Sequence, residues 1–218
     1  MRHEAKPILC YVTDRKTLGA GTHEATADPL PVIRRAIAAG VDWVQVREKD
    51  LPPRPLLELA RGAVTAAHSS ATRILINDRL DVALAASAAG VHLGEASLPA
   101  TAVERWRRAG RAPAGFLMGA SSHSLAAARE AERAGADYIF FGPVFATPSK
   151  AAFGPPQGLE RLAEVCRSVH IPVLAIGGIH LENAAVCLAA GASGLAAIRL
   201  FQESADLAAV VTRLRSAA

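Results

Sequence analysis

Short runs of β-branched and aromatic residues alternate along the chain with longer, Ala-rich amphipathic segments. Eight apolar runs are typical of buried parallel strands: Ile8–Val12, Trp43–Val46, Ile74–Ile76, Val91–Leu93, Phe116–Met118, Tyr138–Phe141, Val173–Ile176 and Leu195–Ile198. The intervening segments predict helices over Pro31–Ala39, Pro55–His68, Leu80–Ala89, Thr101–Ala109, Leu125–Ala134, Leu159–Val169, Leu181–Ala190 and Asp206–Ala217. The pattern therefore predicts one strand and one helix, repeated eight times.

Glycines mark the ends of several predicted helices. Gly40, Gly90, Gly135 and Gly191 each come just before a predicted strand, as a left-handed helix cap would, and Gly110 ends a further helix. Eight units in 218 residues give about 27 residues each. This repeat indicates a single (β/α)8 barrel domain over residues 1–218, with a doubly wound sheet as the alternative.

Composition narrows the class of protein. Hydrophobic residues make up 51% and charged residues 20%, which excludes a disordered chain. No apolar run reaches the roughly 18 residues that a membrane span needs, and from the polar start of the sequence we expect no signal peptide. Three scattered cysteines (Cys10, Cys166 and Cys187) do not form a disulfide framework or a metal motif. We therefore expect a cytoplasmic protein that does not bind membranes.

The charge of the chain favours a small anionic ligand. The net charge is +4, but the arginines are dispersed and aromatics are only 5%, so we expect no nucleic-acid partner. The chain has four lysines, and two of them, Lys49 and Lys150, follow predicted strands at the mouth of the barrel. Lysine binds phosphate as a point charge, whereas arginine offers a bidentate fork.

The second predicted strand ends in Gln45-Val46-Arg47-Glu48-Lys49. Alternation along the strand turns Gln45 and Arg47 toward the barrel axis and the valines toward the helices. An arginine there needs an anionic partner, because an unpaired buried charge is costly. That partner is either a carboxylate of the chain, Glu48 or Asp78, or a bound phosphate.

Other strand ends carry further candidates, each with a plain structural alternative. Gly177-Gly178 suits a phosphate, because glycine lets the backbone approach closely, but it is also a common tight turn. Asn77-Asp78 offers amide and carboxylate oxygens, which either bind Mg²⁺ or cap the helix that follows. His123 is a general acid or base, or a hydrogen-bonded residue at a helix start, and His92 is better explained by packing.

The order of these motifs resembles the thiamin phosphate synthase family over about residues 8–203. The motifs are Val12-Thr13-Asp14, Gln45 to Lys49, Ile76-Asn77-Asp78-Arg79, Gly90-Val91-His92-Leu93-Gly94, Gly142-Pro143-Val144-Phe145 through Thr147 and Lys150, and Ala175-Ile176-Gly177-Gly178-Ile179. The resemblance implies a (β/α)8 barrel and a transferase. Its reaction joins hydroxymethylpyrimidine diphosphate to thiazole phosphate and gives thiamin phosphate and pyrophosphate.

The resemblance also implies a role for each matching residue. Gln45, Arg47, Lys49, Asn77 and Lys150 would hold the pyrimidine diphosphate, Asp78 would bind Mg²⁺, and Ser121 would contact the departing pyrophosphate. Thr147, Gly177, Gly178 and the backbone of Ile198–Arg199 would hold the thiazole phosphate, with Ser149 beside them. We expect Arg47, Lys49, Lys150, Ser121 and His123 to be catalytic, with small-molecule substrates as partners. A homodimer is compatible with this interpretation.

Two positions depart from the family pattern. Ser97 stands where the family has a second acidic Mg²⁺ ligand, so we expect Glu95 to take that place, or water to do so. Arg199 stands where the family has serine, and it either grips the thiazole phosphate or pairs with an acid. Two alternative functions follow: a thiazole tautomerase that uses His123, and a non-catalytic barrel that binds a phosphorylated ligand.

Overall fold

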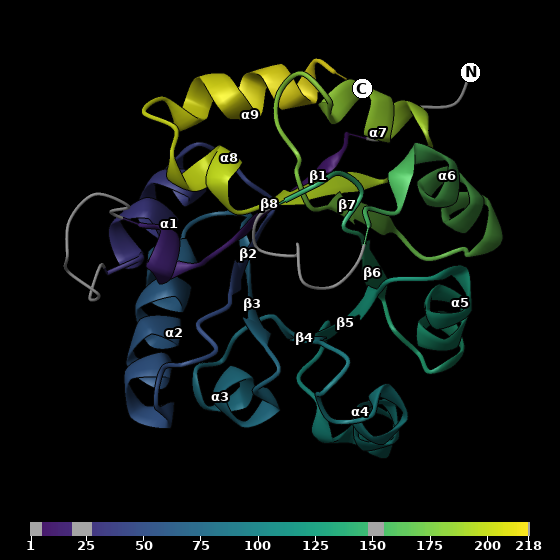
Figure 1. Cartoon of the computed structure of the whole chain (residues 1–218). Helices are drawn as coiled ribbons and strands as arrows, with labels where there is room; N and C mark the ends of the chain where they lie inside the picture. The colour runs from purple at the N-terminus through teal and green to yellow at the C-terminus, as the bar shows by residue number, and fades with distance from the viewer. Residues whose placement is uncertain (1–5, 19–27, 148–154, 218) are drawn as a thin grey trace.

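The computed structural model describes residues 6–18, 28–147 and 155–217, and eight parallel strands among them close into a barrel in sequence order. The strands are β1 (Ile8–Val12), β2 (Trp43–Val46), β3 (Arg73–Asn77), β4 (Gly90–Leu93), β5 (Leu117–Ser122), β6 (Tyr138–Phe141), β7 (Val173–Ile176) and β8 (Gly194–Ala197). The ring is closed by β1 and β8, where Cys10 pairs with Ala196. Figure 1 looks down the axis of this barrel. The predicted (β/α)8 fold is confirmed.

Two hydrophobic cores follow from the alternation along the strands. The barrel interior is packed by a small cluster that consists of Cys10, Val12, Leu75, Tyr138, Phe140, Leu174 and Ala196. The alternate strand residues, such as Val44 and Val46, join the larger core between strands and helices. Gly119 makes room inside the barrel, because a Cβ there would lie 2.1 Å from the ring of Tyr138. These side chains fill the lower part of the barrel interior, and a cavity opens above them toward the carboxyl ends of the strands.

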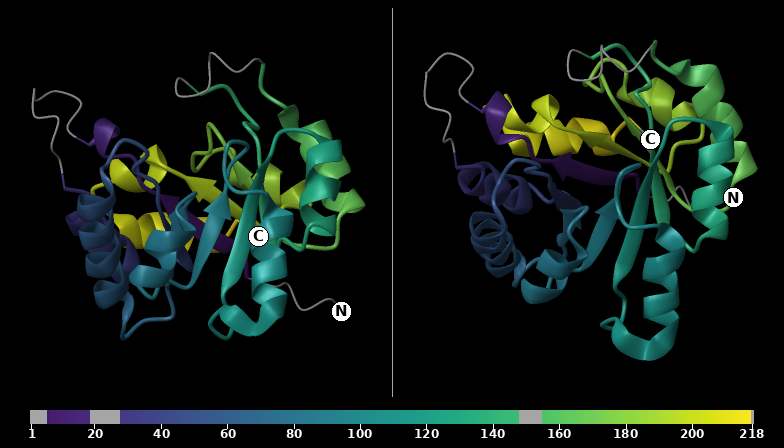
Figure 2. Two further views of the ribbon diagram at one scale, coloured as in Figure 1. Left: turned by 90° about the horizontal axis from the view of Figure 1, so that it is seen from below. Right: turned by 60° about the horizontal axis from the view of Figure 1, so that its bottom comes forward.

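Helices surround the barrel on its outside (Figure 2). They are α1 (Leu30–Ala38), α2 (Pro53–Ala67), α3 (Leu80–Ala85), α4 (Ala100–Trp106), α5 (Leu125–Arg133), α6 (Gly158–Ser168), α7 (Ala184–Ala189), α8 (Arg199–Gln202) and α9 (Leu207–Arg215). Across the described residues, no helix is long and apolar enough to cross a membrane.

The largest differences in helix length occur at α3 and α7, each four residues shorter than predicted, and each has a local cause. α3 ends at Ala85 rather than Ala89, because Ala89 already donates its N–H to Ile74 O of β3. α7 begins at Ala184 rather than Leu181. There the Asn183 amide ties the preceding turn, accepting from His180 N at 2.9 Å and donating to Gly178 O at 2.8 Å.

Further corrections concern element ends. Gly90 is not a left-handed cap but a strand residue of β4, whereas Gly40, Gly110, Gly135 and Gly191 do have positive φ. α4 ends at Trp106, before a π-helical turn over Arg107–Arg111. β5 extends to Ser122, so Ser121 lies within a strand and not after it.

Two short elements were not predicted, and both lie at the carboxyl ends of strands. A 3-10 turn over Arg15–Thr17 follows β1, and α8 follows β8. Both are too short for periodicity to detect. The length of the connection Asp14–Pro29 and its glycine and proline positions predict a mobile lid, but residues 19–27 of this connection lie outside the described part of the chain.

Candidate active site

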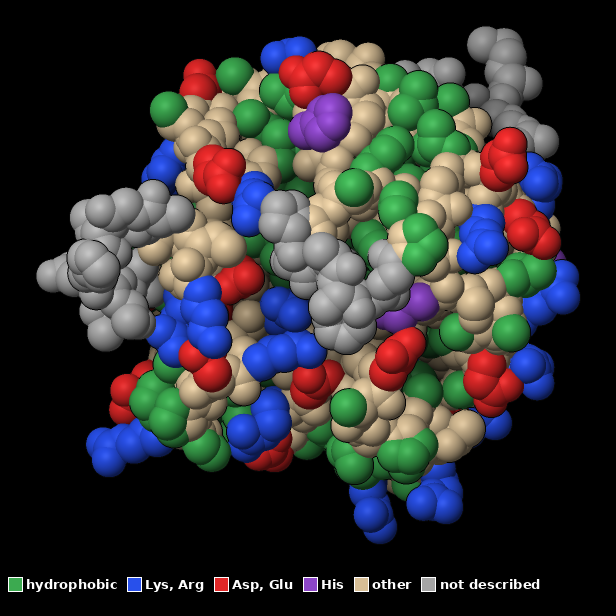
Figure 3. Space-filling view, in the orientation of Figure 1, with side chains coloured by type: hydrophobic (Ala, Val, Ile, Leu, Met, Phe, Trp, Pro, Cys, Tyr) green, Lys and Arg blue, Asp and Glu red, His purple; other side chains and the backbone are tan. Residues whose placement is uncertain are grey.

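A cavity of about 500 Å³ opens at the carboxyl ends of the strands. Its walls contain every described residue that was predicted to bind substrate: Gln45, Arg47, Lys49, Asn77, Ser121, Thr147, Gly177, Gly178, Ile198 and Arg199. Ser149 and Lys150 lie outside the described residues. Lys and Arg side chains gather near the middle of this face in Figure 3. Residues that are up to 154 positions apart in sequence are thus brought to one basic cavity.

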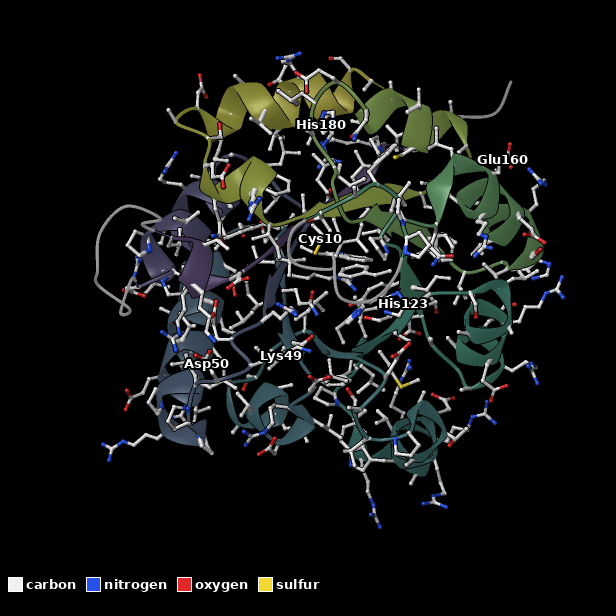
Figure 4. All side chains as sticks on the ribbon, in the orientation of Figure 1. Cys10, Lys49, Asp50, His123, Glu160 and His180 are labelled. Carbon is white, nitrogen blue, oxygen red and sulfur yellow. The ribbon has the colours of Figure 1, made fainter. Side chains whose placement is uncertain are left out.

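Arg47 and Lys49 form the basic part of the wall contributed by β2, and Figure 4 shows Lys49 near the barrel mouth. In the described part of the chain, no carboxylate lies within ion-pair distance of either side chain. Glu48 points elsewhere: both of its carboxylate oxygens accept from Arg15 N at 3.1 Å. Two positive charges therefore face the cavity, which supports a bound anion over an internal ion pair.

A chain of amide hydrogen bonds fixes the wall beside these cations. Gln45 Nε2 donates to Asn77 Oδ1 at 3.0 Å, and Asn77 Nδ2 donates to Asp78 Oδ2 at 2.6 Å. Asp78 has a φ of +61°, a left-handed conformation that asparagine and aspartate tolerate better than other residues. The strained backbone and the amide chain together hold the Asp78 carboxylate in one orientation.

Asp78 is also bound from the β4 side. Its Oδ1 accepts from Gly94 N at 3.1 Å and from the Ser97 hydroxyl. Glu95 does not approach this group: its side chain is 76% exposed, and its Oε1 lies 3.9 Å from His123 Nε2. No cluster of three His, Cys, Asp or Glu that could hold a metal occurs within the described ranges. The donor set fits Mg²⁺ only where water and substrate phosphate oxygens complete the coordination.

His92 lies under the cavity as a neutral, packed residue. Its Nδ1 lies 3.1 Å from Tyr138 Oη, its Nε2 lies 3.0 Å from Ser121 Oγ, and its ring packs on Phe140. The pKa of His92 is lowered to about 3, chiefly by burial; nearby Asp78 opposes this shift and Arg47 adds to it. The interpretation of His92 as a packing and hydrogen-bonding residue agrees with this geometry, and His92 orients Ser121.

His123 lines the cavity and is labelled to the right of the centre in Figure 4. Its Nδ1 contacts the carbonyl oxygen of Gly142. Because a carbonyl only accepts, that nitrogen carries a proton, and Nε2 is left for the cavity or for Glu95. His123 is therefore held by the β6 loop with one ring nitrogen available for hydrogen bonding.

The wall contributed by β7 is made of backbone. Gly177 and Gly178 have φ values of +95° and +65°, and a Cβ at either would collide with the β6 loop, 2.5 Å from Pro143 Cβ or 2.7 Å from Ala146 O. The glycines are thus required by a tight turn, as the plain alternative had it. Within the described residues, the N–H groups of Gly178 and Ile179 donate to no protein acceptor, so the turn also leaves two donors at the cavity.

The β8 end completes this backbone wall. Ile198 and Arg199 line the cavity at the start of α8, and the Arg199 N–H also has no acceptor in the described part of the protein. Arg199 Nε lies 3.6 Å from a carboxylate oxygen of Glu203, with the arginine side chain half exposed. Arg199 therefore pairs with Glu203 and lines the cavity as well, so both roles predicted for it, ion pairing and contact with a ligand, are compatible with its position.

The sequence interpretation missed some of the lining. Gln157, at the start of α6, and Phe140, inside β6, face the cavity, and so does Thr17 on the 3-10 turn after β1. Phe140 follows the alternation of β6 and could have been found from it. Gln157 and Thr17 lie in irregular segments that carry no periodic signal.

Comparisons with known proteins agree on one family. A family model described as thiamine monophosphate synthase matches residues 9–201. The chain is 48% identical over 190 residues to a putative thiamine-phosphate synthase of Geobacter sulfurreducens, covering 87% of this chain and 84% of the relative. It is 40% identical over 205 residues to a thiamine-phosphate synthase of Moorella thermoacetica, covering 94% and 93%.

Solved structures give the same result. A thiamine phosphate pyrophosphorylase from Pyrococcus furiosus superposes with a TM-score of 0.82 at 32% identity, over 98% of this chain and 96% of the other. A 3-hexulose-6-phosphate synthase reaches a TM-score of 0.68 at 16% identity, a likeness of fold alone.

Proposed function

The chain belongs to the thiamine monophosphate synthase family, and from this premise we infer that it is a transferase of thiamin biosynthesis. It couples hydroxymethylpyrimidine diphosphate with thiazole phosphate and forms thiamin phosphate and pyrophosphate. The observation that carries this inference is the pair of cations, Arg47 and Lys49, that face the cavity without a carboxylate partner in the described ranges. A diphosphate supplies the missing negative charge.

The proposed chemistry needs charge stabilisation more than it needs a nucleophile. The bond between the pyrimidine carbinyl carbon and the diphosphate oxygen breaks, and its electron pair leaves with pyrophosphate. The amino-substituted ring delocalises the cation, and the thiazole nitrogen then forms the new bond. Arg47 and Lys49 stabilise the charge that develops on the leaving group, and Ser121 donates a hydrogen bond to it. His123 Nδ1 carries the ring proton, so His123 Nε2 serves as a hydrogen-bond acceptor at the mouth of the cavity.

The other groups orient the two substrates. Gln45 and Asn77, held by their mutual hydrogen bond, position the pyrimidine. The N–H groups of Gly178, Ile179 and Arg199, which have no acceptor among the described residues, bind the thiazole phosphate with Thr147 and hold its ring in line.

The family uses Mg²⁺, and we propose that Asp78 would hold it together with diphosphate oxygens and water. Glu95, whose exposed side chain turns toward His123, would have to reorient to serve as a second protein ligand. When bound there, Mg²⁺ supplies positive charge next to the leaving pyrophosphate. The Ser97 hydroxyl holds Asp78 in place from the side where a second acid would otherwise stand.

The decisive experiment measures pyrophosphate release from the two substrates, with Mg²⁺ and with excess EDTA. We expect release that needs both substrates and Mg²⁺, and that Asp78→Ala abolishes. Release without the thiazole phosphate would indicate hydrolysis instead of transfer. Absence of release together with isomerisation of a thiazole substrate would support the tautomerase.

A further inference from the structure

The 3-10 turn after β1 is held by hydrogen bonds on two sides, and the side chains that make them are not among the proposed catalytic residues. We call the segment Thr13–Thr17 the β1 turn. Asp14 and Thr17 of this turn line the cavity. β1 lies between β2, which leads into Arg47, and β8, which leads into Ile198 and Arg199. The β1 turn therefore stands between the two proposed substrate halves.

Gln202, on α8, fastens the turn on the β8 side. Its Oε1 accepts from Tyr11 Oη at 3.0 Å and from Asp14 N at 2.8 Å. Its Nε2 donates to Asp14 O at 3.1 Å and to Thr17 Oγ1 at 2.7 Å. The side chain is only 8% exposed, and both donors and both acceptor positions of the amide are used.

Glu48 fastens the same turn on the β2 side. Its carboxylate is 4% exposed as a residue and accepts the Arg15 N–H with both oxygens. Burial raises the pKa of Glu48, while hydrogen bonds from Thr13 and Arg15 act in the opposite direction. The turn is thus tied by one buried side chain to each neighbouring strand end.

We propose that Gln202 is a positioning residue that joins the β1 turn to α8, so that the two move as one wall and set the affinity for the thiazole phosphate. The inference rests on the proposed function, because it assigns that substrate to the β8 side. A rigid wall lowers the ordering cost of binding, since its groups need not be fixed when the ligand arrives. Glu48, on the other side, has the corresponding effect on the pyrimidine diphosphate.

The test compares near-isosteric variants. Gln202→Met removes all four hydrogen bonds, Gln202→Glu removes only the two donated ones, and Glu48→Gln loosens the opposite side. Thr72→Val is the matched control. Thr72 directly precedes β3, is also buried, and does not line the cavity. Its hydroxyl donates to Val41 O at 2.7 Å, so the substitution likewise removes a buried hydrogen bond. For each variant the Kd of each substrate is measured by calorimetric titration, and the Tm is measured beside it.

We expect Gln202→Met to raise the Kd of thiazole phosphate about five- to tenfold, as lost ordering hydrogen bonds would, and to change that of the pyrimidine diphosphate less than about twofold. Gln202→Glu should give an intermediate rise, and Glu48→Gln should show the opposite preference. Thr72→Val should lower Tm and leave both Kd values unchanged.

Three results would overturn the proposal. A Gln202→Met protein that differs only in Tm, like the control, would show a purely structural role. Equal rises for both substrates would remove the division between the two sides. If Gln202→Met does not fold, the Gln202→Glu protein decides: an unchanged Kd for thiazole phosphate in that variant would refute the proposal. Failure of the wild-type protein to bind thiazole phosphate would instead refute the proposed function, and the inference with it.

Discussion

The two walls of the cavity achieve anion binding by different means. The wall from β2 and β3 uses the charged side chains of Arg47 and Lys49 and the amides of Gln45 and Asn77. The two amides are oriented by a chain of hydrogen bonds that ends at Asp78. The wall from β7 and β8 uses backbone N–H groups, whose orientation comes from glycines packed against the β6 loop. We refer to them as the side-chain wall and the backbone wall.

The difference teaches where each wall is vulnerable. A side-chain wall can lose its charge by one substitution while the fold is preserved. A backbone wall has no side chain to remove, and it is damaged only by changes that displace the turn. The predictions below use this contrast, in order of decreasing effect.

Removing the charge at the centre of the side-chain wall should have the largest effect. Arg47→Ala should lower kcat/KM about 10²- to 10³-fold, because a preorganised charge next to the leaving group is lost. The measurement is the rate of pyrophosphate release. Arg54→Ala is the control, since Arg54 on α2 is 90% exposed and pairs with Glu58. An equal loss in the two variants would refute the role of Arg47.

Damage to the backbone wall is tested by two glycines with similar φ. Gly158→Ala places a Cβ in open space, whereas Gly178→Ala places one 2.8 Å from Phe145 Cβ. The left-handed conformation costs each variant about 1–2 kcal/mol. We expect the free energy of unfolding, measured in urea, to fall by about 1–3 kcal/mol more in Gly178→Ala than in Gly158→Ala, because the turn at Gly178 must shift. It should also bind thiazole phosphate more weakly, and equal losses of stability and binding would contradict this account.

Two asparagines with hydrogen-bonded side chains give a matched pair, one for each wall. Asn77→Ala breaks the chain between Gln45 and Asp78, and Asn183→Ala breaks the bonds to His180 N and Gly178 O. We expect each substitution to lower the free energy of unfolding by about 1–3 kcal/mol, because its hydrogen bonds are lost. Asn77→Ala should weaken binding of the pyrimidine diphosphate, and Asn183→Ala that of the thiazole phosphate. Titration of both ligands checks this, and the same ligand affected twice would argue against separate walls.

The buried histidine beneath the side-chain wall predicts a pH dependence of stability. The pKa of His92 is lowered from 6.5 to about 3 in the folded protein, so the unfolded chain takes up a proton first as pH falls. The contribution of His92 to stability therefore decreases from pH 6.5 toward pH 3, by about 1.4 kcal/mol per pH unit. Urea unfolding at pH 7, 5.5 and 4.5 should show this slope reduced in His92→Gln. An unchanged slope would mean that His92 is protonated in the fold.

Much of the barrel and of the side-chain wall could be predicted from sequence. The strands have strong local patterns, and the bounds of β1, β2, β6 and β7 agree with the predictions. Arg47, Lys49 and Asn77 carry their chemistry in the side chain, so residue type and position at a strand end were sufficient to place them at the cavity.

The rest depends on contacts between distant segments. That Ser97 binds Asp78, or that Gln202 binds Asp14, is set by tertiary packing and has no local signal. The donors of the backbone wall cannot be identified from the sequence either. Nearly every residue has a backbone N–H, and the fold decides which of these groups has no acceptor in the protein.

The most direct test of the two-wall account is calorimetric titration of each substrate into Arg47→Ala and Gly178→Ala, beside the wild-type protein. The account predicts a crossed result: Arg47→Ala loses affinity for the pyrimidine diphosphate and keeps thiazole phosphate, and Gly178→Ala does the reverse. Loss of both ligands in both folded variants would contradict it, since the cavity would then bind its two anions through one shared site.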